Sequence, residues 1–145
     1  MIETLSAENL KYLTPLVLEL WPGSVFDEEY ENYKDIPDSE NEICYLVKNE
    51  EMYIGFIHLS IRTNYVEGAA ELPVAYLEAI YVKAEYRKTG IGEKLLALVE
   101  NWAKEKGYSQ IASDTELENS ASIDFHKKVG FNEANRIVCF IKELY

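Results

Sequence analysis

The chain has few cysteines and no long hydrophobic run. Its 145 residues contain two cysteines, Cys44 and Cys139, each within an apolar, strand-like segment. Two such thiols exclude a disulfide framework and predict reduced, buried side chains in a cytoplasmic setting. The N-terminus has no basic region before an apolar stretch, and no segment reaches membrane-spanning length. We therefore expect a cytoplasmic protein with no membrane partner.

Positive charge is also scarce. The chain carries 14 Lys and Arg against 26 Asp and Glu, a net charge of −12. This balance excludes a nucleic-acid partner, because phosphate binding needs a positive surface, and it favours a cationic partner instead. Eight of the acids fall between Asp27 and Glu42. They form either a solvated surface or, acting together, a field that steers a polycation toward a cleft.

Neither internal repeats nor a linker interrupts the chain, whose length suits a single domain spanning residues 1–145. Apolar periodicity predicts four helices, from Ser6 to about residue 20 and over 26–33, 91–106 and 120–129. Pro15 kinks or breaks the first of them. Strands are predicted at 2–5, 43–48, 52–61, 75–82, 111–114 and 136–142. This order predicts an α/β protein of the α+β mixed-sheet kind, mostly antiparallel, with a crossover helix after the fourth strand.

The segment Arg87-Lys88-Thr89-Gly90-Ile91-Gly92 stands between an apolar strand and an amphipathic helix. Two glycines and a helix N-terminus allow several backbone N–H groups to point at one anion, which is typical of a pyrophosphate cradle. The segment lacks the Gly-Lys-Ser or Gly-Lys-Thr of a nucleotide P-loop and the third glycine of a dinucleotide fingerprint. The alternative is a plain strand-to-helix turn with solvated cations.

This loop, followed by Asn119 and by the pair Gly130-Phe131, resembles the GNAT superfamily of acetyl-coenzyme A dependent N-acetyltransferases. Within it the chain is most similar to the aminoglycoside 6′-N-acetyltransferases. The shorter matches are Tyr65-Val66-Glu67-Gly68, Tyr76-Leu77-Glu78, Ala112-Ser113-Asp114 and Arg136-Ile137-Val138. The resemblance implies a GNAT-like fold, acetyl-CoA as co-substrate without a metal, and a homodimer that pairs through residues 137–141.

The resemblance also implies roles for particular residues. The catalytic set is Glu78, the Ile80 N–H as oxyanion donor and His126. Acceptor binding is assigned to Trp21, Tyr65, Glu67, Glu78 and Asp114. Acetyl-CoA binding is assigned to the backbone of Ile80 and Val82, to the side chain of Asn119, and to the loop residues Arg87, Lys88, Thr89, Gly90, Ile91 and Gly92.

Three of these side chains have alternatives. Glu78 lies in mid-strand, on the face expected to carry Tyr76 and Ile80; it either points into a polar cleft, where burial raises its pKa, or lies at an edge. Asp114 closes a strand and either binds ligand or caps the next turn. His126 stands where many superfamily members have tyrosine; it donates a proton, stacks on the cofactor or faces solvent. His58 is expected to be a packed residue rather than a catalyst.

The sequence thus predicts transfer of acetyl from acetyl-CoA to the 6′-amino group of an aminoglycoside. No nucleophile stands near a base, which favours direct attack in a ternary complex over a covalent acetyl-enzyme. Two alternatives remain. One is acetylation of another amine, such as a polyamine, a lysine side chain or a protein N-terminus. The other is a non-catalytic acetyl-CoA-binding module, which the two carboxylates disfavour.

Overall fold

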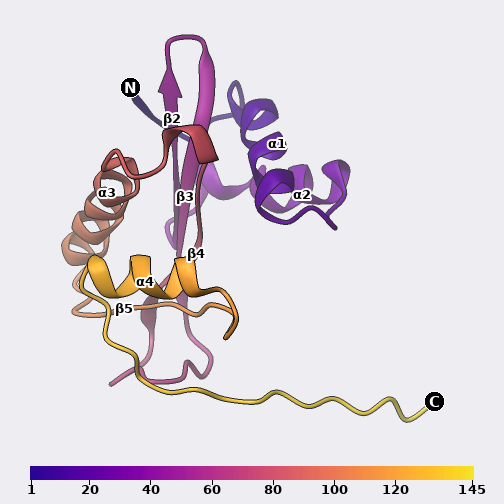
Figure 1. The fold of residues 1–145 in the computed structure, drawn as a ribbon, viewed down its shortest axis with the longest axis vertical. Helices are drawn as coiled ribbons and strands as arrows, with labels where there is room; N and C mark the ends of the chain where they lie inside the picture. The colour runs from indigo at the N-terminus through magenta and orange to yellow at the C-terminus, as the bar shows by residue number, and fades with distance from the viewer.

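The computed structural model describes all 145 residues and is built around a five-stranded sheet in the order β1-β2-β3-β4-β5 (Figure 1). The strands are β1 (Ile2–Thr4), β2 (Glu42–Asn49), β3 (Met52–Arg62), β4 (Val74–Val82) and β5 (Ile111–Ala112). The first four pair antiparallel, and β5 is parallel to β4. The predicted mixed, mostly antiparallel sheet is confirmed.

Helices cover both faces of this sheet (Figure 1). On one face α1 (Leu10–Leu20) and α2 (Phe26–Tyr33) pack on β2 and β3, and on the other lies α3 (Ile91–Glu105). The remaining helical segments are α4 (Ser120–Lys128), η1 (Ile36–Asp38) and η2 (Ala84–Tyr86). No helix has the length and apolar character that crossing a membrane requires.

The start of α1 shows how the local sequence sets an element boundary. The Ser6 N–H donates to Asn9 Oδ1 at 2.8 Å, and the Asn9 N–H donates to Ser6 Oγ at 3.3 Å. This reciprocal pairing satisfies backbone donors ahead of the helix, which begins at Leu10 rather than directly after Ser6. Pro15 lies inside the helix without ending it. The buried face of α1 repeats at helical spacing, as predicted: Leu10, Leu13, Leu16 and Val17.

A bulge in β4 changes which way its side chains point. Leu59 of β3 pairs with Leu77 and His58 pairs with Ala79, so Glu78 has no partner in the register. Ala79 therefore packs in the core beneath α1 and α2, while Ile80 packs in the core beneath α3. The expectation that Tyr76, Glu78 and Ile80 share one face is wrong, because the extra residue shifts the alternation after Glu78.

Residues 131–145 form neither helix nor strand, and after Asn135, which still bonds Glu67, the chain extends away from the body of the molecule (Figure 1). Val138 is 76%, Phe140 91% and Ile141 92% exposed. The predicted strand at 136–142 is absent, because a strand needs a neighbour for its backbone groups and the single chain supplies none there. Cys139 is consequently exposed, so the expectation of two buried thiols holds for Cys44 alone, whose burial raises its pKa.

Candidate active site

The predicted pyrophosphate cradle has the backbone conformation that an anion site needs. Lys88 and Gly90 both adopt positive φ, 62° and 86°. Gly90 caps α3, and the first bond of the helix runs from the Lys94 N–H to the Gly90 carbonyl at 3.1 Å. The preceding N–H groups of this turn have no intrahelical acceptor and stand at the positive end of the helix dipole. The loop therefore fits a phosphate group.

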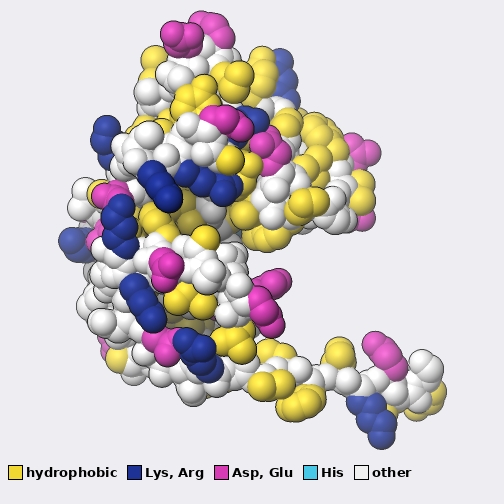
Figure 2. All heavy atoms as spheres, viewed as in Figure 1, with side chains coloured by type: hydrophobic (Ala, Val, Ile, Leu, Met, Phe, Trp, Pro, Cys, Tyr) yellow, Lys and Arg dark blue, Asp and Glu magenta, His cyan; other side chains and the backbone are white.

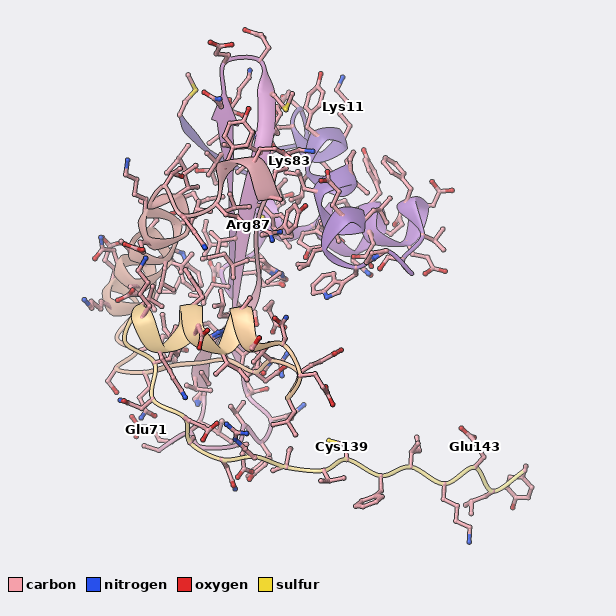
Figure 3. All side chains as sticks on the ribbon, in the orientation of Figure 1. Lys11, Glu71, Lys83, Arg87, Cys139 and Glu143 are labelled. Carbon is pink, nitrogen blue, oxygen red and sulfur yellow. The ribbon has the colours of Figure 1, made fainter.

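Side chains hold the loop against the end of β4. Arg87 Nε donates to the Val82 carbonyl at 2.7 Å, and the Arg87 guanidinium lies 5.6 Å from the centre of the Tyr81 ring. Thr89 Oγ1 donates to the Tyr86 carbonyl at 2.6 Å. Figure 3 shows Arg87 in the middle of the molecule, between α3 on one side and α1 and α2 on the other. The cation nearest the cradle is thus fixed rather than freely solvated.

The edge of β4 beyond this loop is open. β5 pairs with β4 only at Ala75 and Tyr76, so no strand lies beside residues 77–82 on that edge. Some backbone groups of this stretch, which includes Ile80 and Val82, are therefore available to a bound molecule. An extended amide-containing chain, such as the pantetheine arm of coenzyme A, suits this edge. The cradle and the open edge together fit acetyl-CoA.

Gly92 has a second neighbour that sequence reasoning missed. A Cβ at this position would lie 3.1 and 3.2 Å from two ring atoms of Phe125 and 3.8 Å from Ile80. Phe125 belongs to α4, so the missing side chain at Gly92 lets α3 and α4 approach each other. The predicted assignment of Gly92 to the pyrophosphate therefore accounts for only part of what this position requires.

Asn119 and His126 lie on α4. Asn119 caps the helix, and its Oδ1 accepts from the Ser122 N–H at 3.1 Å, which leaves the amide nitrogen as a donor. His126 Nδ1 lies 2.7 Å from the Ser122 carbonyl, and Nε2 lies 2.8 Å from Ser113 Oγ. A carbonyl only accepts, so Nδ1 carries the proton and Nε2 accepts from the Ser113 hydroxyl. Sequence reasoning did not select Ser113.

Glu78, a predicted acceptor residue, bonds two side chains of β3. Its Oε2 accepts from Ser60 Oγ at 2.6 Å and from Arg62 Nε at 2.8 Å, and its Oε1 accepts from Arg62 Nη2 at 2.7 Å. Burial by itself raises the pKa of Glu78, but these hydrogen bonds and the charge of Arg62 outweigh it and lower the pKa. The expectation of a raised pKa is wrong, because Glu78 lies beside a cation on the neighbouring strand.

Asp114 belongs to the same group of side chains. The Tyr76 hydroxyl donates to Asp114 Oδ2, and the Arg62 guanidinium lies 3.5 Å from the centre of the Tyr76 ring. We call Ser60, Arg62, Tyr76, Glu78 and Asp114 the carboxylate group. Sequence reasoning selected Glu78 and Asp114 but missed the other three. The available signal was the alternation of polar residues at 58, 60 and 62 in an otherwise apolar strand.

The other predicted acceptor residues lie apart from the carboxylate group. Tyr65, 77% exposed, donates to Glu67, which also accepts from Asn135 Nδ2 at 2.7 Å. Trp21 caps the end of α1, and its indole makes no hydrogen bond. His58 is packed, as predicted: it bonds Glu42 at 2.9 Å and meets the Tyr33 ring edge-on.

A hollow separates the α1–α2 lobe from the lower part of the molecule, with acidic side chains on its lower rim (Figure 2). The acids at the start of α2, Asp27, Glu28 and Glu29, lie on the lobe itself. In the same view Lys and Arg side chains lie above the hollow, so its two rims differ in charge. The site therefore combines an anion cradle, an open strand edge and partly buried carboxylates on an acidic protein.

Comparison with known proteins agrees with this geometry. Residues 10–131 match the acetyltransferase (GNAT) family. The chain is 32% identical to aminoglycoside N(6′)-acetyltransferase type 1 of Salmonella enteritidis, over 97% of both chains, and 32% identical to that of Serratia marcescens, over 99% of both.

Solved structures extend the likeness to three dimensions. One is AAC(6′)-Iy in complex with the bisubstrate analogue CoA-S-monomethyl-acetylneamine, with a TM-score of 0.92, 31% identity and coverage of 99% of this chain and 97% of that one. Another is AAC(6′)-Ih of Acinetobacter baumannii, with a TM-score of 0.91, 33% identity and coverage of 100% and 99%. Sequence, fold and site geometry thus agree, and the chain belongs to the acetyltransferase (GNAT) family.

Proposed function

We propose that the protein is a cytoplasmic aminoglycoside 6′-N-acetyltransferase, which moves acetyl from acetyl-CoA to the 6′-amino group of an aminoglycoside. The observation that carries this proposal is the carboxylate group, in which Arg62 and Tyr76 link two acids, Glu78 and Asp114. The full-length similarity to aminoglycoside N(6′)-acetyltransferases supports it. A polycationic acceptor also suits a chain with net charge −12.

Bound acetyl-CoA supplies an acetyl thioester, and this chain supplies its binding site. The loop from Arg87 to Gly92 holds the pyrophosphate with backbone N–H groups, and the Asn119 amide adds a donor. The backbone of Val82 and Ile80 binds the pantetheine arm, and the Ile80 N–H serves as donor to the thioester carbonyl oxygen. Each of these groups lies on β4, on its following loop, at the start of α3 or at the start of α4.

The acceptor amine is bound and deprotonated by carboxylates. Glu78 is ionised at neutral pH because its pKa is lowered, so it holds an ammonium group by charge and accepts its proton directly or through a water. Asp114 binds a further ammonium group, and Trp21, Tyr65 and Glu67 lie farther out as contacts for the rest of a large acceptor. His126 is the proposed proton donor to the leaving thiolate in its doubly protonated form, in which Nε2 carries a proton in place of accepting one from Ser113.

An initial-rate panel tests this proposal. Thiol release from acetyl-CoA is measured with kanamycin, spermidine and a lysine peptide as acceptors. We expect kanamycin to be much the best, with the acetyl group on its 6′-nitrogen by mass spectrometry. Comparable rates with all three would favour a general amine acetyltransferase, and no release with any amine would favour an acetyl-CoA-binding module.

We also propose a homodimer that pairs through residues 137–141. This segment exposes Ile137, Val138, Phe140 and Ile141 in the single chain, and β5 is a two-residue strand at the edge of the sheet. An exposed edge and an exposed apolar segment both invite pairing, and a second copy supplies both partners.

Light scattering after size exclusion gives the mass directly. We expect twice the chain mass of 16.7 kDa. Val138→Asp should give the monomer, whereas Met52→Asp, which changes an exposed apolar residue on the β2–β3 hairpin, should leave the dimer intact. A wild-type mass near that of one chain at micromolar concentration would refute the proposal.

A further inference from the structure

Arg62 is placed to hold both acceptor carboxylates at once. It is the last residue of β3, and its side chain remains 42% exposed while that of Glu78 is 23% exposed. Two of the three hydrogen bonds that Glu78 accepts come from Arg62, one to each carboxylate oxygen. A planar guanidinium that grips both oxygens fixes the rotation of the carboxylate as well as its position.

The Arg62 guanidinium also acts on Asp114 indirectly, through the ring of Tyr76. The guanidinium carbon lies 3.5 Å from the centre of the Tyr76 ring, a cation–π contact. The same ring carries the hydroxyl that donates to Asp114. A displacement of Arg62 therefore disturbs Glu78 directly and Asp114 through Tyr76. Lysine cannot replace it, because an ammonium group has neither the fork nor the flat surface.

We propose that Arg62 is a positioning residue for acceptor recognition, which holds Glu78 and Asp114 in register so that a cationic acceptor meets two pre-aligned carboxylates. This inference rests on the proposed acceptor chemistry. With Arg62 counted, the carboxylate group carries one net negative charge in place of two. Arg62 thus limits the mutual repulsion of the acids while leaving part of Glu78 Oε1 and Asp114 Oδ1 for the acceptor.

Three variants separate the parts of this arrangement. Arg62→Met removes charge and fork but keeps a long side chain, Arg62→Lys keeps the charge, and Tyr76→Phe keeps the ring but removes the bond to Asp114. Lys34→Met is the matched control, because Lys34 also pairs with a glutamate and its side chain is 44% exposed. Thermal melts first establish that each variant is folded.

Calorimetric titration and pH–rate profiles then measure the effects. We expect Arg62→Met to weaken kanamycin binding about tenfold, consistent with losing charge-assisted hydrogen bonds, and to leave the acetyl-CoA dissociation constant unchanged. The acidic limb of kcat/KM for kanamycin should move to higher pH, because Glu78 loses the cation that lowers its pKa. Arg62→Lys should weaken kanamycin binding with a smaller movement of this limb. Tyr76→Phe should weaken binding without moving it.

A Glu78→Gln variant tests whether the acidic limb of the pH–rate profile belongs to Glu78. Other titratable or charged groups near Glu78 are His58 on β3 with its partner Glu42, Tyr33 on α2, and Asp114 after β5. Arg62→Met added to Glu78→Gln should therefore leave the limb where Glu78→Gln alone puts it. A double-mutant cycle of Arg62→Met and Tyr76→Phe should be non-additive.

Two results overturn the proposal about Arg62: an unchanged kanamycin dissociation constant in folded Arg62→Met, or additivity in the cycle with Tyr76→Phe. A wild-type protein that neither binds nor acetylates kanamycin overturns the proposed aminoglycoside activity instead. If Arg62→Met fails to fold, Arg62→Lys and Tyr76→Phe decide by the same two measurements.

Discussion

Replacing Gly90 with alanine tests the cradle through its backbone alone. Gly90 has φ of 86°, and a Cβ built there meets nothing within 4 Å. The substitution therefore introduces no steric contact. Its only cost is that of holding an L-residue in the left-handed region, about 1–2 kcal/mol.

That cost must appear in one of two measurements. If the loop keeps its shape, the free energy of unfolding falls by this amount, and the melting temperature drops by about 3–6 °C for a domain of this size. If the loop relaxes to negative φ, stability is spared, but the N–H groups leave the cradle. Acetyl-CoA binding then weakens by about 5- to 30-fold, because 1.4 kcal/mol is a factor of ten.

Calorimetric titration with acetyl-CoA and a thermal melt of the same sample measure both quantities. Gly92→Ala is the comparison, since Gly92 lies inside α3 and its Cβ would meet the Phe125 ring at 3.1 Å. Gly92→Ala should disturb the α3–α4 contact, and Gly92→Val should lower the melting temperature as well as acetyl-CoA affinity. Gly90→Ala with both melting temperature and affinity at wild-type values would refute the conformational argument.

Three further predictions concern the acceptor side and its pH dependence. Glu78→Gln should cut turnover by about ten- to a thousandfold, the span of general-base loss. Asp114→Asn should chiefly raise the Michaelis constant for the aminoglycoside. Steady-state kinetics across pH measure both effects, and wild-type turnover in Glu78→Gln would contradict these separate roles. His126→Phe should lower turnover and flatten the basic limb of the pH profile, and an unchanged limb would exclude His126 as the proton donor. Because the pKa of Glu78 is lowered on folding, its contribution to stability is present above the ordinary carboxyl pKa and is lost as pH falls through the folded value. Acid titration followed by circular dichroism should thus show a smaller acid-induced loss of stability in Glu78→Gln than in wild type, and identical losses would count against the ion pair with Arg62.

Local sequence was sufficient to predict most helices and strands and the loop from Arg87 to Gly92. The apolar spacing that predicts α1 and α3, and the glycines that permit positive φ before α3, act within a few residues of each other. Such patterns reflect short-range sterics and the burial of one helix face, so they can be read without knowing what lies across the sheet. The motif Arg87 to Gly92 accordingly predicted a tight, glycine-containing loop before α3, and the structure has positive φ at Lys88 and Gly90 there.

The acceptor side depended on contacts between strands. Arg62 and Glu78 are 16 residues apart, and they meet because β3 and β4 pair. The alternation of apolar residues within one strand does not reveal which side chains of the neighbouring strand will lie beside a given residue. The sequence therefore predicted Glu78 as a site residue but gave its pKa the wrong direction.

The C-terminal segment also separates what the sequence determines from what the tertiary structure determines. Its apolar residues 137–141 predicted a strand, and the sequence by itself determined that these side chains need a partner. Only the tertiary structure decided that the single chain does not supply one, since residues 137–141 lie beyond the last contact of the segment, at Asn135, and remain exposed. The physical reason is that a strand is stable through hydrogen bonds and burial provided by a neighbour, and neither is encoded in the strand alone.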